Sequence, residues 1–277
     1  MNLADNKIKT PLYLQLTQYV RKGYNSLDDD SKREVTEFVK SCQHPEGGFK
    51  GRDERRDIYY SLFGTWIFAA LDLSDSAENP LLTYNKETRG DKIDILASIL
   101  MSVLQQDKGF KKPSLLKLIR LTFCGDRQIS FYYRFFLFVL IYDALFKGWL
   151  LKFAGRIILP FFSLSGETPC TINAALLVAR HVVLPDTESH QKLLLSFFDE
   201  RGGFKSFTDT ETPDLLSTAA ALFALKVSGA DLRILAPACI GFIQDNYSSG
   251  AFLAGNGDEI RDLEYTFYGL LALGTLL

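Results

Sequence analysis

An eight-residue pattern near the start of this chain recurs near its end. Segment 57–64 reads Asp-Ile-Tyr-Tyr-Ser-Leu-Phe-Gly, and segment 262–269 reads Asp-Leu-Glu-Tyr-Thr-Phe-Tyr-Gly. Asp, Tyr, Ser or Thr, an aromatic residue and Gly recur in register at an offset of 205 (262 − 57). Such a repeat is typical of stacked units, because one unit alone cannot bury its apolar face.

Two further sets of related segments define the unit that repeats. Segments 167–170 and 211–214 share Glu-Thr-Pro, and each precedes an apolar stretch rich in alanine and leucine. Gly-Gly-Phe occurs at 47–49 and 202–204, with a variant Gly-Ala-Phe at 250–252. Glycine permits a tight reversal of the chain at these points. One unit therefore reads as a helix, a Gly-Gly-Phe turn, a polar loop and a second helix.

Apolar residues recur with helical spacing along the chain, and strand signals are nearly absent. The predicted helices are 10–22, 31–43, 57–71, 92–106, 113–123, 130–145, 147–163, 170–182, 189–200, 214–228, 231–245 and 262–276. We predict an all-α fold, a ring of five to six helical hairpins in one domain spanning 1–277, with helix 10–22 as an N-terminal addition. The pairing of helices across 75–165 stays open. A Gly-Phe turn at 109–110 indicates that the helix before it is the first of a hairpin, whereas counting back from the C-terminal repeats makes that helix the second.

Composition narrows the classes of function. The formal net charge is −2 and no stripe of Lys and Arg appears, so nucleic-acid binding is not expected. The 22 Phe and 12 Tyr indicate either an aromatic-lined cavity or dense helix packing. Four separated cysteines without a CxxC pair, and no signal-like N-terminus, favour a cytoplasmic location. The apolar stretch 131–151 is interrupted by charges, and it is either a buried helix or a peripheral membrane contact.

The Gln-x-x-x-Gly-Gly-Phe turn at 43–49, the turn at 202–204 and the two Asp-x-x-Tyr helices resemble the prenyltransferase and squalene-cyclase repeat family. The resemblance is good over 31–71 and 187–277 and weak over 75–165. It implies an α/α toroid whose inner helices surround an aromatic-lined cavity for isoprenoid chains. The C-terminal third looks most like protein prenyltransferase β subunits, which makes a separate helical subunit a candidate partner.

The same resemblance implies where a catalytic zinc would lie. In the β subunits an Asp-x-Cys motif and a later His hold that zinc, and the corresponding positions here are Asp214, Leu216 and Tyr265. A catalytic zinc needs three protein ligands and an open position, which these side chains do not supply. The chain's three histidines lie in a turn and at helix edges: His44, His181 and His190. We therefore expect no zinc site.

The cyclase branch of the family uses Asp-x-Asp-Asp, whose central acid protonates an alkene or an epoxide. Aligning the Thr-Ala pair that follows this motif with 218–219 places Asp214, Leu216 and Ser217 on its acids, so the central acid is missing. Asp209 and Glu211 lie nearby and could supply a proton donor by another route.

Acidic residues lie at or near the starts of several predicted helices, and two interpretations of them stay open. They are Asp57, Asp94, Asp214 and Asp262. They cap the helices, since a carboxylate there accepts backbone N–H groups. Alternatively they form a rim of carboxylates at one end of the ring, able to bind Mg²⁺ or to work as acid and base. Under the second interpretation the candidate catalytic residues are Asp214, Glu211, Asp262 and Tyr265.

Candidate substrate-binding residues surround the first repeat and reach the last. Three arginines could hold a diphosphate through forked, charge-assisted hydrogen bonds, or they could be solvated. Three aromatic residues could stabilise a carbocation with their rings, or they could be core. These six candidates are Arg52, Arg55, Arg56, Tyr60, Trp66 and Tyr268.

Together these features predict an isoprenoid-handling enzyme that lacks the family's zinc site. The expected reaction is prenyl transfer or terpene cyclisation on a prenyl diphosphate or a terpene chain. The alternative is a non-catalytic toroid that binds a lipid or a protein partner. A carbohydrate-active toroid with paired carboxylates would not account for the Gly-Gly-Phe turns.

Overall fold

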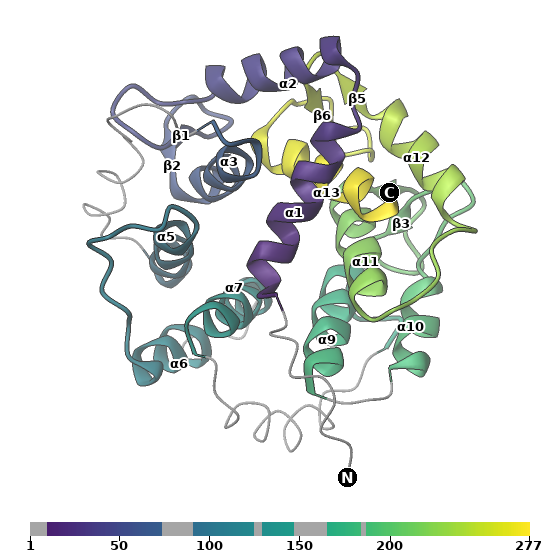
Figure 1. The fold of residues 1–277 in the computed structure, drawn as a ribbon. Helices are drawn as coiled ribbons and strands as arrows, with labels where there is room; N and C mark the ends of the chain where they lie inside the picture. Colours follow the sequence, from purple (N-terminus) through teal and green to yellow (C-terminus); the bar gives the residue numbers. More distant parts are fainter. Residues whose placement is uncertain (1–9, 74–90, 125–128, 147–164, 184–186) are drawn as a thin grey trace.

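The computed structural model describes residues 10–73, 91–124, 129–146, 165–183 and 187–277, and these contain eleven helices. Figure 1 shows the helices arranged as a ring. The expected helix 147–163 lies outside the described residues. None of the described helices has both the length and the apolar character that crossing a bilayer requires.

Six of the described helices pack side by side as an inner ring. Each contacts the next one along the chain, and the last contacts the first, which closes the ring. They are α3 (Ile58–Leu71), α5 (Lys92–Leu104), α7 (Ile129–Leu145), α9 (Cys170–Val183), α11 (Leu215–Val227) and α13 (Leu263–Leu276). Helices covered on several sides can be apolar all round. In α3, for example, every residue from Ser61 to Phe68 is buried.

The outer helices are amphipathic and cover the inner ring from outside (Figure 1). They are α2 (Asp29–Ser41), α6 (Leu115–Phe123), α10 (Glu188–Leu195) and α12 (Ala236–Asp245). α2 buries only Val35 and Val39. α5 lies between α3 and α7 in the inner ring. The helix before the Gly-Phe turn at 109–110 is therefore an inner helix. It is the second helix of its hairpin, as counting back from the C-terminal repeats indicates.

α7 carries most of the apolar stretch 131–151, and it is an inner helix. Leu137, Phe138, Leu140 and Ile141 are buried in the core. Of the two interpretations of this stretch, its position favours the buried helix. Residues 147–151 lie outside the described part of the chain.

The repeated turns contain two-residue antiparallel strand pairs, which are too short to leave a strand signal in the sequence. They pair β1 (Phe49–Lys50) with β2 (Arg56–Asp57), β3 (Phe204–Lys205) with β4 (Pro213–Asp214), and β5 (Tyr247–Ser248) with β6 (Ala251–Phe252). In the first unit the Phe49 backbone N–H donates to Ser61 Oγ at 2.8 Å, and this hydroxyl donates to the Asp57 carbonyl. Thr218 and Thr266 make the same two hydrogen bonds in the later units.

The recurring glycine of each end repeat is explained by the recurring phenylalanine. A Cβ on Gly64 would lie 2.5 Å from the Phe49 ring, and a Cβ on Gly269 would lie 2.2 Å from the Phe252 ring. The phenylalanine of each turn thus packs directly on the backbone of the inner helix that follows. The Asp, the Ser or Thr and the Gly recur in register because together they form one joint.

The N-terminal helix α1 (Leu12–Asn25) crosses the inside of the ring instead of extending it (Figure 1). It packs mainly against α13 and α3. A Cβ on Gly23 would lie 1.9 Å from the Leu270 carbonyl oxygen, and one on Gly274 would lie 1.8 Å from the Tyr19 carbonyl oxygen. The two helices therefore approach each other backbone to backbone, at a distance that only glycine permits.

Polar contacts show at which end of the ring α1 lies. Arg21 Nε donates to the Ala70 carbonyl at 2.6 Å, and its guanidinium pairs with Asp72 at 2.7 Å, both at the C-terminal end of α3. The Leu12 backbone N–H donates to Asp143 near the C-terminal end of α7. α1 therefore closes the end at which the inner helices finish. We call the opposite end, where the inner helices begin, the mouth.

Candidate active site at the mouth of the ring

The predicted acids at the inner-helix starts act as N-caps. Asp57 accepts from the Tyr60 N–H at 3.0 Å, Asp214 from Ser217 at 2.7 Å and Asp262 from Tyr265 at 2.9 Å. Burial raises the pKa of Asp214, although the Ser217 hydrogen bonds oppose the shift. The capping interpretation of the sequence is thus confirmed for these three acids.

The other predicted acids occupy different positions. Glu211 is an exposed loop residue, and its backbone carbonyl accepts a hydrogen bond from Arg201. The N-cap of α5 is Asp91, and Asp94 completes a capping box three residues later. Burial, and then the charge of Asp91, raise the pKa of Asp94.

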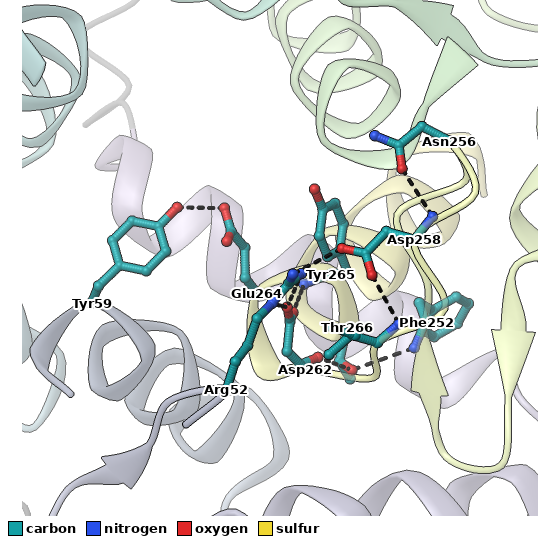
Figure 2. A network of polar contacts seen from close by, with 10 residues as sticks. Arg52, Tyr59, Phe252, Asn256, Asp258, Asp262, Glu264, Tyr265 and Thr266 are labelled. Atoms are coloured by element: carbon teal, nitrogen blue, oxygen red, sulfur yellow. Dashed lines mark hydrogen bonds and ion pairs between the residues drawn. The ribbon is translucent and has the colours of Figure 1, made fainter. Parts of the chain in front are cut away.

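The three predicted arginines do not converge on one point. Arg52 binds two carboxylates, Asp262 through Nη2 at 2.6 Å and Asp258 through Nη1 at 2.8 Å (Figure 2). Its guanidinium carbon also lies 6.0 Å from the centre of the Tyr265 ring. Arg55 pairs with Asp53 on the exposed surface. The remaining arginine, at position 56, donates to the Glu46 carbonyl.

Glu264 is the functional candidate that the sequence analysis missed. It lies near the start of α13 and accepts a hydrogen bond from the Tyr59 hydroxyl, as Figure 2 shows. Burial raises its pKa to about 7, and the charge of Asp262 acts in the same direction; the Tyr59 hydrogen bond and Arg52 oppose the shift. A carboxyl group with such a pKa can give or take a proton near neutral pH.

A signal for Glu264 was present in the repeat. Its equivalent in the first unit, 205 residues earlier, is Tyr59, the residue that donates to it. The two equivalent positions thus face each other across the junction of the first and last units. Glu264 is thus an acid at a position where the first unit of the repeat has an aromatic residue.

Aromatic side chains from three inner helices gather around Glu264. The Tyr59 ring lies 5.4 Å from that of Tyr133 and 5.1 Å from that of Phe63, which in turn lies 5.5 Å from Tyr268. We define Tyr59, Tyr133, Glu264 and Tyr268 as the mouth cluster. All four side chains are half-buried.

The phenols of the mouth cluster are held neutral by their surroundings. Burial raises the pKa of Tyr59, Tyr133 and Tyr268, and the charge of Glu264 raises each of them further. The buried Tyr133 hydroxyl oxygen has no hydrogen-bond partner among the described residues. The cluster therefore presents aromatic rings, neutral hydroxyls and one carboxyl group that titrates near pH 7.

Of the three aromatic residues predicted to bind substrate, two lie at the mouth. Tyr268 belongs to the mouth cluster, and the Tyr60 ring lies 5.6 Å from that of Tyr59. Trp66 lies deeper and is buried against α1: its Nε1 donates to Thr17 at 2.9 Å, and its ring packs on Phe267. Trp66 thus helps to join α1 to the ring.

The side chains at the family's zinc positions do not fit zinc. The Asp214 carboxylate accepts the Ser217 N–H, and Leu216 carries no donor atom. Burial raises the pKa of the Tyr265 phenol to about 12, so it is neutral at physiological pH. Across the described ranges, His, Cys, Asp and Glu side chains form no group of three or more that could hold a metal ion.

Described residues pack closely in the ring interior next to α1. Between Leu12, Phe136, Val139 and Phe223 lies a cavity of about 10 Å³. That volume is at the lower limit for a single water molecule. Tyr268 and the α1 contact at Gly274 are six residues apart on α13 (274 − 268), or about 9 Å along a helix. Any ligand at the mouth cluster therefore meets α1 after a short distance.

Comparison with known proteins places this fold in a family. The family model of the prenyltransferase alpha-alpha toroid domain matches residues 12–142 and 154–276. No curated protein and no solved structure matches the chain. Because the two matched ranges cover nearly the whole chain, the protein belongs to the prenyltransferase alpha-alpha toroid family. The expected resemblance and the expected all-α toroid are both confirmed.

Proposed function

We propose that the protein is an isoprenoid-processing enzyme and that the mouth cluster is its active site. The observation that carries this proposal is the position of Glu264, a carboxyl group with a pKa of about 7 among the rings of Tyr59, Tyr133 and Tyr268. An acid that stays partly protonated at neutral pH can deliver a proton. Aromatic faces can stabilise the positive charge that follows.

The reaction that best fits these groups is proton-initiated cyclisation. Glu264 gives its carboxyl proton to an alkene carbon or an epoxide oxygen, which leaves a carbocation on the substrate and a carboxylate on the enzyme. A second alkene of the same chain attacks the cation and forms the new carbon–carbon bond. Loss of a proton from the resulting cation to the Glu264 carboxylate gives the cyclic product and regenerates the acid.

A neutral isoprenoid fits the mouth better than a prenyl diphosphate does. Arg52 is already bound to Asp258 and to the buried Asp262, so a diphosphate would have to displace carboxylates from it. Arg55 is paired with Asp53. The proximity of α1 also favours a short chain over a long one. Prenyl transfer from a diphosphate, with or without Mg²⁺, remains the second form of the proposal.

One observation favours the non-catalytic alternative. α1 occupies the ring interior beside α13, where Leu12, Leu16 and Val20 are buried. A toroid whose interior is partly filled could bind a lipid or a protein partner at its mouth without turning it over. Such a module would use the same aromatic rings but would not need the proton of Glu264.

The test compares binding and turnover for the same compounds. The purified protein is mixed with C10 and C15 isoprenoid alcohols and epoxides, and separately with C10 to C20 prenyl diphosphates with and without Mg²⁺. Melting temperatures report binding, because a ligand that binds only the folded state stabilises it. Gas chromatography with mass spectrometry reports new products.

We expect the neutral C10 compounds to raise the melting temperature and to yield a cyclic product. Tyr268→Ala should abolish both effects, whereas the exposed control Glu37→Gln should change neither. Binding without any product would reject catalysis and support the binding module. No melting shift with any of these compounds would reject both forms of isoprenoid binding.

A further inference from the structure

The outer helix α6 exposes an unusual amount of apolar surface. Leu116 is 60% exposed, Ile119 38% and Phe123 46%, although all three are large hydrophobic residues. They lie three and four residues apart, so they share one face of the helix. Only Leu118 and Thr122 of this helix are fully buried. α6 lies at the periphery of the ring, as Figure 1 shows.

The same segment is strongly basic. Residues 108–124 contain five Lys and Arg and no Asp or Glu, a formal charge of +5 (5 − 0), whereas the whole chain carries −2. The five cations are Lys108, Lys111, Lys112, Lys117 and Arg120. Lys117 and Arg120 are exposed and three residues apart on the helix, beside the apolar face. The local charge is therefore opposite in sign to the net charge of the molecule.

A pocket lies beside this helix. It has a volume of about 360 Å³ and is lined by Lys92, Ser114, Lys117, Arg120 and Leu121 among others. Lys92 comes from the start of α5, and its ammonium group donates to the Cys124 carbonyl. Three cationic side chains from two helices thus border one concave site next to the exposed apolar residues.

We propose that α6 and this pocket form a docking surface for a membrane that contains anionic lipids. A membrane surface offers an apolar layer and a negatively charged headgroup layer side by side. Leu116, Ile119 and Phe123 would enter the boundary between headgroups and acyl chains, as the apolar face of an interfacial helix does. Lys92, Lys117 and Arg120 would bind the phosphate groups of the headgroups in the pocket.

The positive charge and the exposed apolar face of α6 together favour an anionic membrane over other binding partners. An acidic protein or a soluble phosphate would account for the cations but not for three exposed hydrophobic residues on the same helix. An uncharged apolar partner would account for those residues but not for the charge of +5 over 108–124. This surface is separate from the stretch 131–151, and it does not depend on the chemistry at the mouth.

The experiment measures sedimentation of the purified full-length protein with lipid vesicles. Vesicles of phosphatidylcholine alone are compared with vesicles that also contain phosphatidylglycerol. We expect binding only to the anionic vesicles, and we expect it to weaken as salt rises, because screening shortens the range of the electrostatic attraction. Lys117→Gln with Arg120→Gln should weaken binding about 30-fold, since each cation near an anionic surface contributes about a factor of five.

Matched variants separate the two parts of the surface from general effects. Leu116→Ser with Ile119→Ser should also weaken binding to anionic vesicles, by roughly 10-fold or more. Lys22→Gln with Lys40→Gln removes two cations on α1 and α2, and Ile234→Ser removes an apolar side chain that is 88% exposed elsewhere. Both controls should bind like the wild type. Melting curves of each variant identify any that fail to fold, and the single variants Lys117→Gln and Leu116→Ser then replace them.

Three results would overturn the proposal. One is equal binding, or none, to vesicles with and without phosphatidylglycerol. Another is unchanged binding in folded α6 variants, which would place the membrane contact elsewhere. The third is polyglutamate, or inorganic phosphate at millimolar concentration, binding as tightly as the vesicles do, which would assign the site to an acidic protein or a free anion.

Discussion

Replacing Glu264 by Gln should make the protein more stable at alkaline pH and should flatten its stability between pH 5 and 7. Glu264 has a pKa of about 7 in the folded protein, against an ordinary value of 4.5. As pH rises above 4.5, the unfolded chain releases this proton first. Folding stability therefore falls through this interval and levels off only above the folded pKa.

The magnitude follows from the size of the shift. A difference of 2.5 pH units (7 − 4.5) at 1.36 kcal/mol per unit corresponds to about 3 kcal/mol. Gln keeps an oxygen that can accept the Tyr59 hydroxyl, but it has no carboxyl group to ionise. Glu264→Gln should therefore match the wild type near pH 4 and exceed its stability by about 3 kcal/mol at pH 8.

The assay is urea unfolding of both proteins at half-unit steps from pH 4 to pH 8, with the difference in the free energy of unfolding plotted against pH. Taking the difference cancels the titration of the acids that do not interact with Glu264. Glu37→Gln, on the exposed side of α2, is the matched control, and its difference should stay near zero. A difference for Glu264→Gln that is flat with pH would refute the environment assigned to this residue.

Three further changes test the joints of the ring, the first two by urea unfolding and the third by limited proteolysis. Arg52→Ala leaves the buried Asp262 without its ion pair and should lower the free energy of unfolding by roughly 2 kcal/mol. Arg55→Ala breaks only an exposed pair and should lower it by less than about 0.5 kcal/mol. Equal losses for the two variants would contradict this account. Gly269→Ala should lower the free energy of unfolding by about 2 kcal/mol because the new Cβ meets the Phe252 ring. Gly241→Ala, at a helix position with open space around it, should be neutral or stabilising. Unchanged stability of Gly269→Ala would disprove the packing of Phe252 on Gly269. Gly274→Ala should loosen α1 from α13 and expose the junction near Ser26 to limited proteolysis; unchanged cleavage would disprove the close helix contact.

The repeat made the fold predictable. In the end repeats the Asp caps the inner helix, the Ser or Thr hydrogen-bonds to the turn, and the Gly packs against the Phe of the turn. A match at these spacings therefore indicates the joint between an outer and an inner helix. The helix ranges followed from continuous apolar stretches in the buried inner helices and from apolar periodicity in the amphipathic outer helices. The helix 10–22 was expected as an addition, but its path through the ring was not. Close contact of Gly23 and Gly274 links residues 251 positions apart (274 − 23), and no local pattern encodes it.

The candidate site was predictable only in part. Asp262, Tyr60 and Tyr268 were identified because they belong to the repeat, and all three lie at the mouth. The role of Arg52 depends on the Asp258 and Asp262 carboxylates, and these partners come from the other end of the chain. Glu264 was missed because its raised pKa results from burial and from the charge of Asp262, and its sequence position alone shows neither.

The role of Glu264 as the proton donor can be tested by the pH dependence of product formation from a neutral C10 isoprenoid. Turnover by the wild type should fall as pH rises through about 7, where Glu264 loses its proton. Glu264→Gln should lower turnover by roughly 10²-fold or more with binding retained. Asp214→Asn should stay near the wild type, because Asn caps a helix nearly as well as Asp. Full turnover by a folded Glu264→Gln protein, or a wild-type rate that does not change between pH 6 and 8, would contradict the account.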